Sequence, residues 1–216
     1  MITQGIKDVL FGLNRHLTKP GTLAAAARYR LGGVKEAEGL AVHLGCGGHY
    51  IPGMVNADGN LFRKVDLWLD LRNRLPFPDR SCRFVYSSHT IEHLFPYEAI
   101  ALLREIRRVL AVGGVVRIAV PSVTHALWVA QGGQTEDWPR PFADPVAQAV
   151  NYLFCDGQHK YAYNFDILAS FAREAGFGDA RDLSPALGDF PSPKTYGGLT
   201  VGDREPVGSL VVELSA

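Results

Sequence analysis

Short apolar runs alternate with amphipathic stretches along most of this chain. Residues 40–44 form an apolar run bounded by glycines, which predicts a buried parallel strand. Residues 115–120 form a β-branched run that predicts another strand. Between them, apolar residues three and four positions apart predict a helix that begins near Pro96 and ends near Gly113. The alternation of strand and helix is typical of an α/β sheet.

The same patterns predict five more strands and three more helices. The strands are expected at residues 54–57, 65–69, 84–86, 180–183 and 209–214. The helices are expected at residues 123–130 and 145–154 and after Asn164, whose side chain suits a helix N-cap. The last two strands should form a hairpin at the sheet edge. Their connection, residues 184–208, holds several Gly and Pro residues and is interpreted as a long surface loop.

The N-terminal region is predicted to be helical. Apolar residues from Ile2 to Leu17 indicate an amphipathic helix that ends at the Lys-Pro-Gly sequence of residues 19–21. A second, Ala-rich helix is expected at residues 22–30. Two interpretations are open for residues 2–17: a helix that makes peripheral contact with a membrane surface, or one that covers the sheet or a substrate pocket. The second is favoured because the cationic face is thin.

A glycine-rich turn follows the first predicted strand directly. Gly45, Cys46 and Gly47 allow positive backbone φ angles and let a ligand lie against bare main chain. The next strand ends at Asp58. Backbone amides at one end and a carboxylate at the tip of the next strand are typical of a nucleoside site, in which the acid holds the ribose hydroxyls.

Four sequence blocks resemble one family. LGCG at residues 44–47, with Gly53, Asn56 and Asp58, resembles the LGCG-x-G-W-x-N-x-D motif of type 11 class I S-adenosylmethionine (SAM) dependent methyltransferases. An aspartate before LPFPD (residues 75–79), the stretch YSSHTIEHL (86–94) and the block LLREIRRVLAVGG (102–114) are also similar to that family.

The resemblance implies a single doubly wound, mostly parallel seven-stranded sheet, the Rossmann-like methyltransferase fold. The expected strand order is 3-2-1-4-5-7-6 with the seventh strand antiparallel. Residues 1–38 are expected to be an N-terminal helical extension, and residues 39–216 the SAM-binding methyltransferase domain. Residues 122–163, which are rich in aromatic side chains, are interpreted as an inserted acceptor cap.

The resemblance also implies a set of cofactor-binding residues for SAM. Asp58 is expected at the ribose, and Asp70 and Leu71 at the adenine. Ser87 and Ser88 are expected beside the methionine arm, and His43 stands where many relatives carry an acid for the amino group. The full set is His43, Gly45, Cys46, Gly47, Asn56, Asp58, Asp70, Leu71, Ser87 and Ser88.

The implied reaction is methyl transfer to an oxygen or nitrogen of a small polar or sugar-like acceptor. A hydroxyl acceptor benefits from a general base, and the weak candidates are His89, His93 and His159. The alternative for Glu92 and His93 is that they hydrogen-bond to each other and hold the loop, which is favoured. No cluster of carboxylates in the sequence demands a metal ion, so no metal site is expected.

Composition and charge limit the kinds of partner that the chain is expected to bind. Lys and Arg together number 22, as do Asp and Glu, so no overall field attracts nucleic acid, and no nucleic-acid partner is expected. Three widely spaced cysteines indicate reduced thiols and a cytoplasmic location. No apolar run approaches the roughly 18 residues of an integral membrane segment.

Two other functional classes fit the glycine turn. One is a non-catalytic SAM-binding protein that serves regulation or assembly. The other is a nicotinamide-dependent oxidoreductase, which is disfavoured because Tyr50 stands where its third glycine belongs. Asp58 also follows Gly45 too soon for that fingerprint, which places its acid about 20 residues on.

Overall fold

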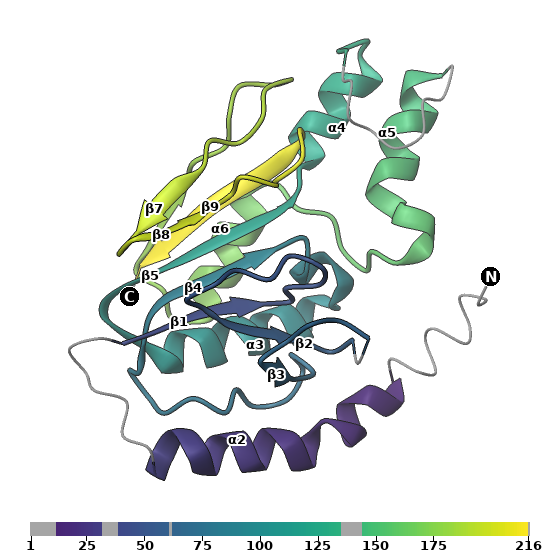
Figure 1. Ribbon diagram of the computed structural model, residues 1–216. Helices are drawn as coiled ribbons and strands as arrows, with labels where there is room; N and C mark the ends of the chain where they lie inside the picture. The colour runs from purple at the N-terminus through teal and green to yellow at the C-terminus, as the bar shows by residue number, and fades with distance from the viewer. Residues whose placement is uncertain (1–11, 32–38, 61, 135–143, 216) are drawn as a thin grey trace.

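One mixed sheet forms the centre of the molecule (Figure 1). The structure is a computed structural model and describes residues 12–31, 39–60, 62–134 and 144–215. The seven strands of the sheet lie in the order β3-β2-β1-β4-β5-β9-β6. Their bounds are β1 Leu40–Leu44, β2 Val55–Asp58, β3 Leu67–Trp68, β4 Cys82–Ser88, β5 Leu110–Pro121, β6 Asp179–Asp182 and β9 Ser209–Ser215.

The predicted strand order is confirmed. Strands β1 to β5 pair in parallel, and β9 runs antiparallel to both β5 and β6. The antiparallel β9 is the seventh strand of the expectation. The third strand is shorter than the predicted 65–69, since only Leu67 and Trp68 pair with β2. Parallel pairing places the carboxyl ends of β1, β2, β3, β4 and β5 at one edge, where ligands of open α/β sheets bind.

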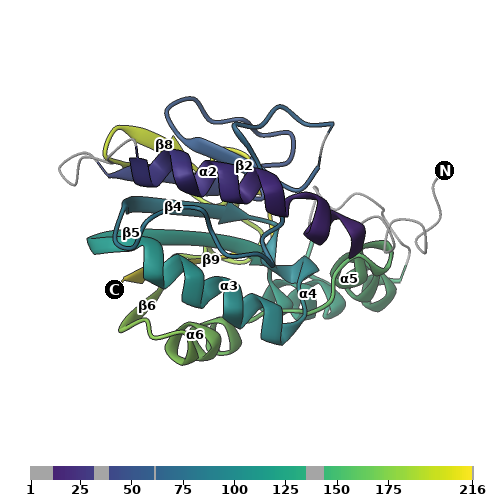
Figure 2. The ribbon, with the colours of Figure 1, turned by 90° about the horizontal axis from the view of Figure 1, so that it is seen from below.

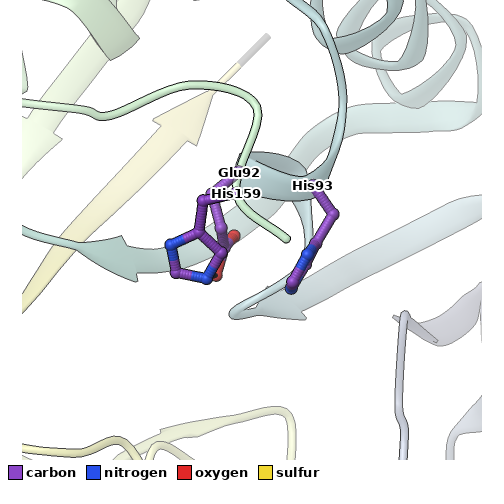
Figure 3. A group of neighbouring side chains, drawn as sticks. All are labelled: Glu92, His93 and His159. Carbon is purple, nitrogen blue, oxygen red and sulfur yellow. Dashed lines mark ion pairs between the residues drawn. The ribbon is translucent and has the colours of Figure 1, made fainter. Parts of the chain in front are cut away.

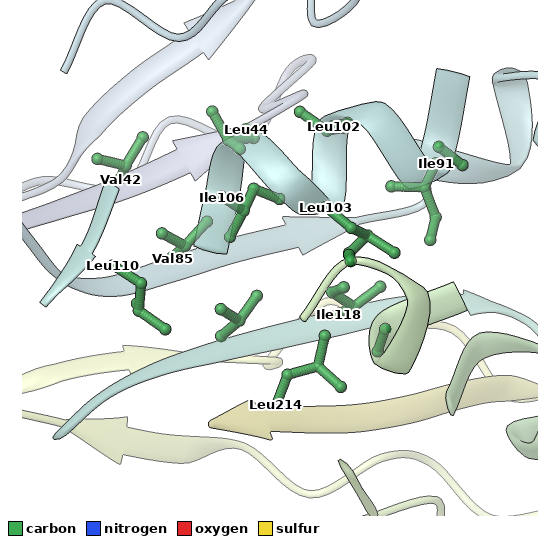
Figure 4. Close-up of a cluster of buried hydrophobic side chains, with 14 of the residues drawn as sticks. Val42, Leu44, Val85, Ile91, Leu102, Leu103, Ile106, Leu110, Ile118 and Leu214 are labelled. Carbon is green, nitrogen blue, oxygen red and sulfur yellow. The ribbon is translucent and has the colours of Figure 1, made fainter. Parts of the chain in front are cut away.

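Three helices cover one face of the sheet (Figure 2). They are α2 Lys19–Leu31, α3 Pro96–Val109 and α6 Phe165–Glu174. The apolar stripe of α3 lies fully in the main core, and Figure 4 shows its leucines and Ile106 against residues of β1 and β4. Helix α3 begins where Glu98 accepts a hydrogen bond from the Phe95 N–H at 3.0 Å. Helix α6 begins with the predicted N-cap, since Asn164 accepts from the Ile167 N–H.

The opposite face carries a two-stranded hairpin, so the prediction of a long surface loop at 184–208 is wrong. Strand β7 (Lys194–Tyr196) and strand β8 (Leu199–Val201) pair antiparallel around two glycines with positive φ angles. The hairpin packs against a second, smaller core cluster that includes Val201. Glycine and proline indicated a loop, but here the glycines form the turn of a hairpin whose apolar residues are buried.

The connection between β1 and β2, residues 45–54, contains no helix and is shorter than the dozen or more residues usual for a parallel crossover. The Asn56 carboxamide holds this connection together. Its Oδ1 accepts from the Ile51 N–H, and its Nδ2 donates to the carbonyls of Ile51 and Met54, each at 2.9 Å. The Asn56 side chain therefore fixes the conformation of this connection by hydrogen bonds, where a longer crossover helix would fix it by packing on the sheet.

Residues 122–163, the expected acceptor cap, leave the sheet and return to it at one point. Ser122 and Tyr163 form an isolated bridge, and the Val123 N–H donates to the Tyr163 carbonyl. Between them, α4 (Val123–Ala130) and α5 (Pro145–Phe154) pair beyond the end of β5 (Figure 1). Both helices have the predicted bounds. The 3-10 turn η2 (Cys155–Gly157) follows α5, and a second one, η1 (Ile91–His93), lies between β4 and α3.

The N-terminal helices differ from the prediction at one position. Residues 12–17 are helical, Thr18 is a turn, and α2 begins at Lys19, so the Lys-Pro-Gly sequence opens a helix and does not end one. Proline is tolerated in the first turn, where its missing N–H is not needed. Residues 2–11 of the predicted first helix lie outside the described residues. No helix in the described ranges is long and apolar enough to cross a membrane.

Candidate active site

The glycine turn after β1 has two different surfaces. A Cβ atom at Gly45 would lie 2.2 Å from the Thr90 hydroxyl oxygen, so glycine is required for this turn to pack on the turn after β4. A Cβ atom at Gly47 would meet no atom within 4 Å. Gly47 has a φ of +52° and presents bare backbone to open space. A ligand can therefore lie directly against the main chain here.

Asp58 lies beside this turn at the end of β2. Its carboxylate accepts hydrogen bonds from the Gly47 N–H at 2.8 Å and the Asn60 N–H at 2.7 Å. These bonds fix the carboxylate and leave lone pairs on both oxygens, because a carboxylate has about four acceptor positions. Asp58 is half-buried. The arrangement fits the paired hydroxyls of a ribose.

Asp70 is more constrained than its position in the sequence indicated. It is buried, and its two oxygens accept from Arg72 Nε at 2.9 Å and Arg72 Nη2 at 2.6 Å. The spacing Asp-Leu-Arg could have signalled this pair, but sequence reasoning missed it. Leu71 and Arg72 also line a pocket of about 330 Å³ whose other walls include Arg15 and Tyr97. The helix at residues 12–17 therefore reaches the adenine end of the predicted site.

Three other predicted residues lie with their side chains in the protein interior. The Asn56 carboxamide is committed to the connection described above. His43 is buried with its ring 4.8 Å from that of Tyr86. Burial lowers the pKa of His43 to about 4, so the imidazole is neutral. Cys46 is buried too, and burial raises the pKa of its thiol to about 12, which keeps it protonated.

Ser87 and Ser88 end β4 at the same edge. Ser87 is buried, and its hydroxyl has no hydrogen-bond partner among the described residues. Ser88 is half-buried. An unsatisfied buried hydroxyl beside a ligand edge is consistent with a partner that the protein chain does not supply.

The turn after β4 holds His89 in an unusual conformation. Its φ is +48°, which is uncommon for a residue with a Cβ atom and concentrates at functional sites. Its Nε2 lies 3.0 Å from Ser209 Oγ, whose own proton goes to the Pro206 carbonyl. His89 Nε2 is therefore the donor, and Nδ1 lies 3.5 Å from Glu92 Oε1.

Glu92 and His93 do not hydrogen-bond to each other through their side chains, so the favoured interpretation of this pair is wrong. Glu92 is 1 % exposed and neither carboxylate oxygen has a hydrogen-bond partner in the described chain. What holds the loop is the backbone: the Glu92 carbonyl accepts from the N–H groups of Lys160 and Tyr161. These bonds bring the segment after η2 alongside the turn after β4.

His159 and His93 both lie beside the Glu92 carboxylate (Figure 3). His159 Nδ1 donates to the Leu153 carbonyl at 2.9 Å, and His93 Nδ1 to the Gln158 carbonyl at 3.3 Å. Burial lowers the pKa of His159, so its imidazole stays neutral. The sequence predicted no metal site, but these three side chains are brought within 4.8 Å of one another, measured between their ligand atoms.

The comparison with protein families gives one match. Residues 46–118, from the glycine turn through most of β5, match the model of a methyltransferase domain of the Methyltransf_11 family. This match spans the segments that build the carboxyl edge of a sheet with the expected methyltransferase strand order. Over these residues the chain is similar to the class I SAM-dependent methyltransferases. Its activity is SAM-dependent methyl transfer, and its cofactor is SAM.

Solved structures support the fold of this methyltransferase. A SAM-dependent methyltransferase from Archaeoglobus fulgidus has a TM-score of 0.53 at 14 % identity, with 90 % of this chain and 93 % of that one covered. A Thermotoga maritima protein named a possible histamine N-methyltransferase has a TM-score of 0.50 at 13 % identity, covering 89 % and 91 %. None of the curated protein sequences compared with this chain matches it.

Proposed function

We propose that this methyltransferase moves the methyl group of SAM to an oxygen or nitrogen of a small polar or sugar-like acceptor. The observation that carries the proposal is the His89 imidazole at the end of β4. It is held by Ser209, and its Nδ1, which carries a lone pair when the ring is neutral, lies beside the buried Glu92 carboxylate. A group that can take a proton is useful to a hydroxyl or ammonium acceptor.

Three features of the chain fit the cofactor. The bare backbone at Gly47 can lie against the nucleoside, and Asp58 is fixed to accept from the ribose hydroxyls. Ser87 offers a buried hydroxyl without a partner among the described residues. We propose that Leu71 packs on the adenine and that Asp70, oriented by Arg72, accepts from its amino group. Cys46 and Ser88 contribute backbone and hydroxyl groups at the same edge.

The cofactor supplies an activated methyl group on a sulfonium, so the chain has little covalent chemistry to perform. Its residues orient the acceptor and exclude water. When the acceptor hydroxyl or ammonium loses its proton, His89 Nδ1 is the lone pair placed to take it, and Glu92 stabilises the imidazolium that forms. His93 and His159 already use their Nδ1 protons on backbone carbonyls.

The character of the site favours a small polar acceptor. The carboxyl edge beyond β4 is lined by imidazole, carboxylate and hydroxyl groups, which recognise hydroxyls and amines. The chain as a whole has a formal charge of zero, so it does not draw in a long polyanion by its overall field. The paired helices α4 and α5 beyond β5 give this edge a wall.

The test is methyl transfer from radiolabelled SAM to pools of sugars, small alcohols and small amines. We expect label in one of these pools, and a loss of about 100-fold or more in kcat for His89→Ala with the affinity for SAM unchanged. His16→Ala, which changes an exposed histidine on the helix at residues 12–17, is the matched control. Labelling of nucleic acid or protein alone, or full turnover by His89→Ala, would overturn the proposal.

A further inference from the structure

Glu92, His93 and His159 bring two imidazole rings and a carboxylate together. Leu153 and Gln158 carbonyls can only accept, so His159 and His93 must carry their protons on Nδ1. In the neutral form of each ring, the Nε2 atom then carries a lone pair. Glu92 adds a buried carboxylate whose oxygens have no hydrogen-bond partner in the described residues.

Such a group is unstable without positive charge at its centre. Removing an ionised carboxylate from water costs several kcal/mol unless a partner compensates for it. His89 does not hydrogen-bond to this carboxylate: its Nε2 donates to Ser209, and its Nδ1 lies 3.5 Å from Glu92 Oε1.

We propose that Glu92, His93 and His159 bind a divalent transition-metal ion at the carboxyl edge of the sheet. Two imidazole nitrogens and one carboxylate oxygen are a ligand set that Zn²⁺ and Fe²⁺ use at sites with an open coordination position. The three ligand atoms lie within 4.8 Å of one another. Ligands of a tetrahedral zinc ion are roughly 3.4 Å apart, so a shift of about 1 Å in these side chains closes the site.

The surroundings of these ligands are those of a prepared metal site. Metal-binding histidines donate their second ring N–H to a carbonyl or carboxylate, which fixes the tautomer and the ring orientation. Both histidines here do so, to the carbonyls of Leu153 and Gln158. The two chain segments are joined by hydrogen bonds from the N–H groups of Lys160 and Tyr161 to the Glu92 carbonyl.

The site adjoins the cofactor edge without being part of it. Thr90, two residues before Glu92, contacts Gly45 of the glycine turn through a hydrogen bond of 3.3 Å. His93 and His159 are half-buried, so the open coordination position faces an accessible region. An ion here can bind an oxygen or nitrogen of the acceptor as a Lewis acid and hold it near the transferred methyl group. The inference goes beyond the proposed acceptor class and does not depend on it.

The test measures metal binding without any turnover. Tag-free protein is stripped with a chelator and titrated with Zn²⁺ by calorimetry, and with Co²⁺ by visible absorption, which reports the coordination geometry. We expect one ion per chain for both metals. Glu92→Gln keeps the shape of the side chain and removes the charge, and we expect it and His159→Ala to weaken binding by about 100-fold or more.

His16→Ala is the matched control and should bind one ion like the unchanged protein. Circular dichroism of each variant shows whether it is folded, and Glu92→Gln, being isosteric, keeps the test valid if His159→Ala unfolds. Absence of binding, or binding that survives in Glu92→Gln and His93→Ala, would overturn the inference. The metal site is decided by the binding measurement alone. Methyl transfer by metal-free protein would support the proposed function whatever the binding result is.

Discussion

His43 lies in the middle of β1, buried against the rings of Tyr86 and His49. Desolvation is the main cause that lowers its pKa to about 4, and His49 adds to it. The ordinary value of about 6.5 applies in the unfolded chain. Below that pH, His43 is protonated in the unfolded chain but stays neutral in the folded protein. Stability is therefore lost as the pH falls from about 6.5 to about 4.

We predict that His43→Phe reduces this acid sensitivity. At pH 4.5 the depressed pKa should cost the unchanged protein roughly 2 kcal/mol relative to pH 7, beyond what the variant loses. Urea unfolding of both proteins at the two pH values measures the difference. An equal loss in both proteins would show that His43 does not titrate as its burial requires.

The predicted site residues differ in whether their contacts are made within neighbouring elements of the chain or between distant ones. Gly45, Gly47 and Asp58 could be predicted from sequence, because a glycine turn and a strand-end acid belong to neighbouring elements. The ion pair of Asp70 with Arg72, two residues on, is local as well and was overlooked. The buried Glu92 carboxylate without a hydrogen-bond partner among the described residues was not predicted, because the sequence does not show which donors reach its oxygens.

The β7–β8 hairpin is the element that the sequence analysis did not find, and it takes the place of helices on the second face of the sheet. It contacts the β1–β2 connection, where a Cβ atom at Gly53 would lie 2.9 Å from Leu199. Beyond the hairpin, Glu205 is buried and accepts from Arg117 Nη2 at 2.8 Å and from the Tyr86 hydroxyl at 3.1 Å. The sequence holds no local sign of a pair formed across so many residues.

We predict that Glu205→Gln destabilises the protein by about 3 kcal/mol or more, because it leaves the Arg117 guanidinium buried without its counter-charge. The matched control is Glu174→Gln, which removes the exposed partner of Arg104 and should cost less than about 1 kcal/mol. Urea denaturation measures both. Equal effects would mean that the Arg117 pair contributes no more than a surface ion pair.

The helices and strands themselves were predictable where packing and local pattern agree. The stripe on α3 and the bounds of α4 and α5 were correct because apolar spacing agrees with a start signal in each helix, a proline in the first turn of α3 and α5 and the N-cap Ser122 in α4. The Lys-Pro-Gly sequence was misread because it can open a helix as well as end one.

The whole molecule couples cofactor binding to stability. We predict that S-adenosylhomocysteine at about 100 times its Kd stabilises the protein by about 2.7 kcal/mol, which raises the Tm by roughly 5–10 °C at this size. NAD should leave the Tm unchanged. Asp58→Ala should fold but show a much smaller shift, since its carboxylate is the ribose acceptor of the proposed site.

Asp189→Asn, which changes an exposed aspartate far along the chain, is the control for that experiment and should keep the full shift. Differential scanning fluorimetry gives all the values. Stabilisation by NAD in place of S-adenosylhomocysteine would contradict the cofactor, and a full shift in Asp58→Ala would remove that residue from the nucleoside site.

The bridge between Ser122 and Tyr163 makes residues 123–162 an insertion whose two ends meet at the sheet. Because its two ends are already hydrogen-bonded to each other, the length of chain between them hardly changes the entropy of closing the loop. Helices α4 and α5 can therefore be lengthened, shortened or exchanged while the sheet and the nucleoside end stay as they are. Selection for a new acceptor could act on this insertion alone, with the methyl-donor half of the enzyme inherited unchanged.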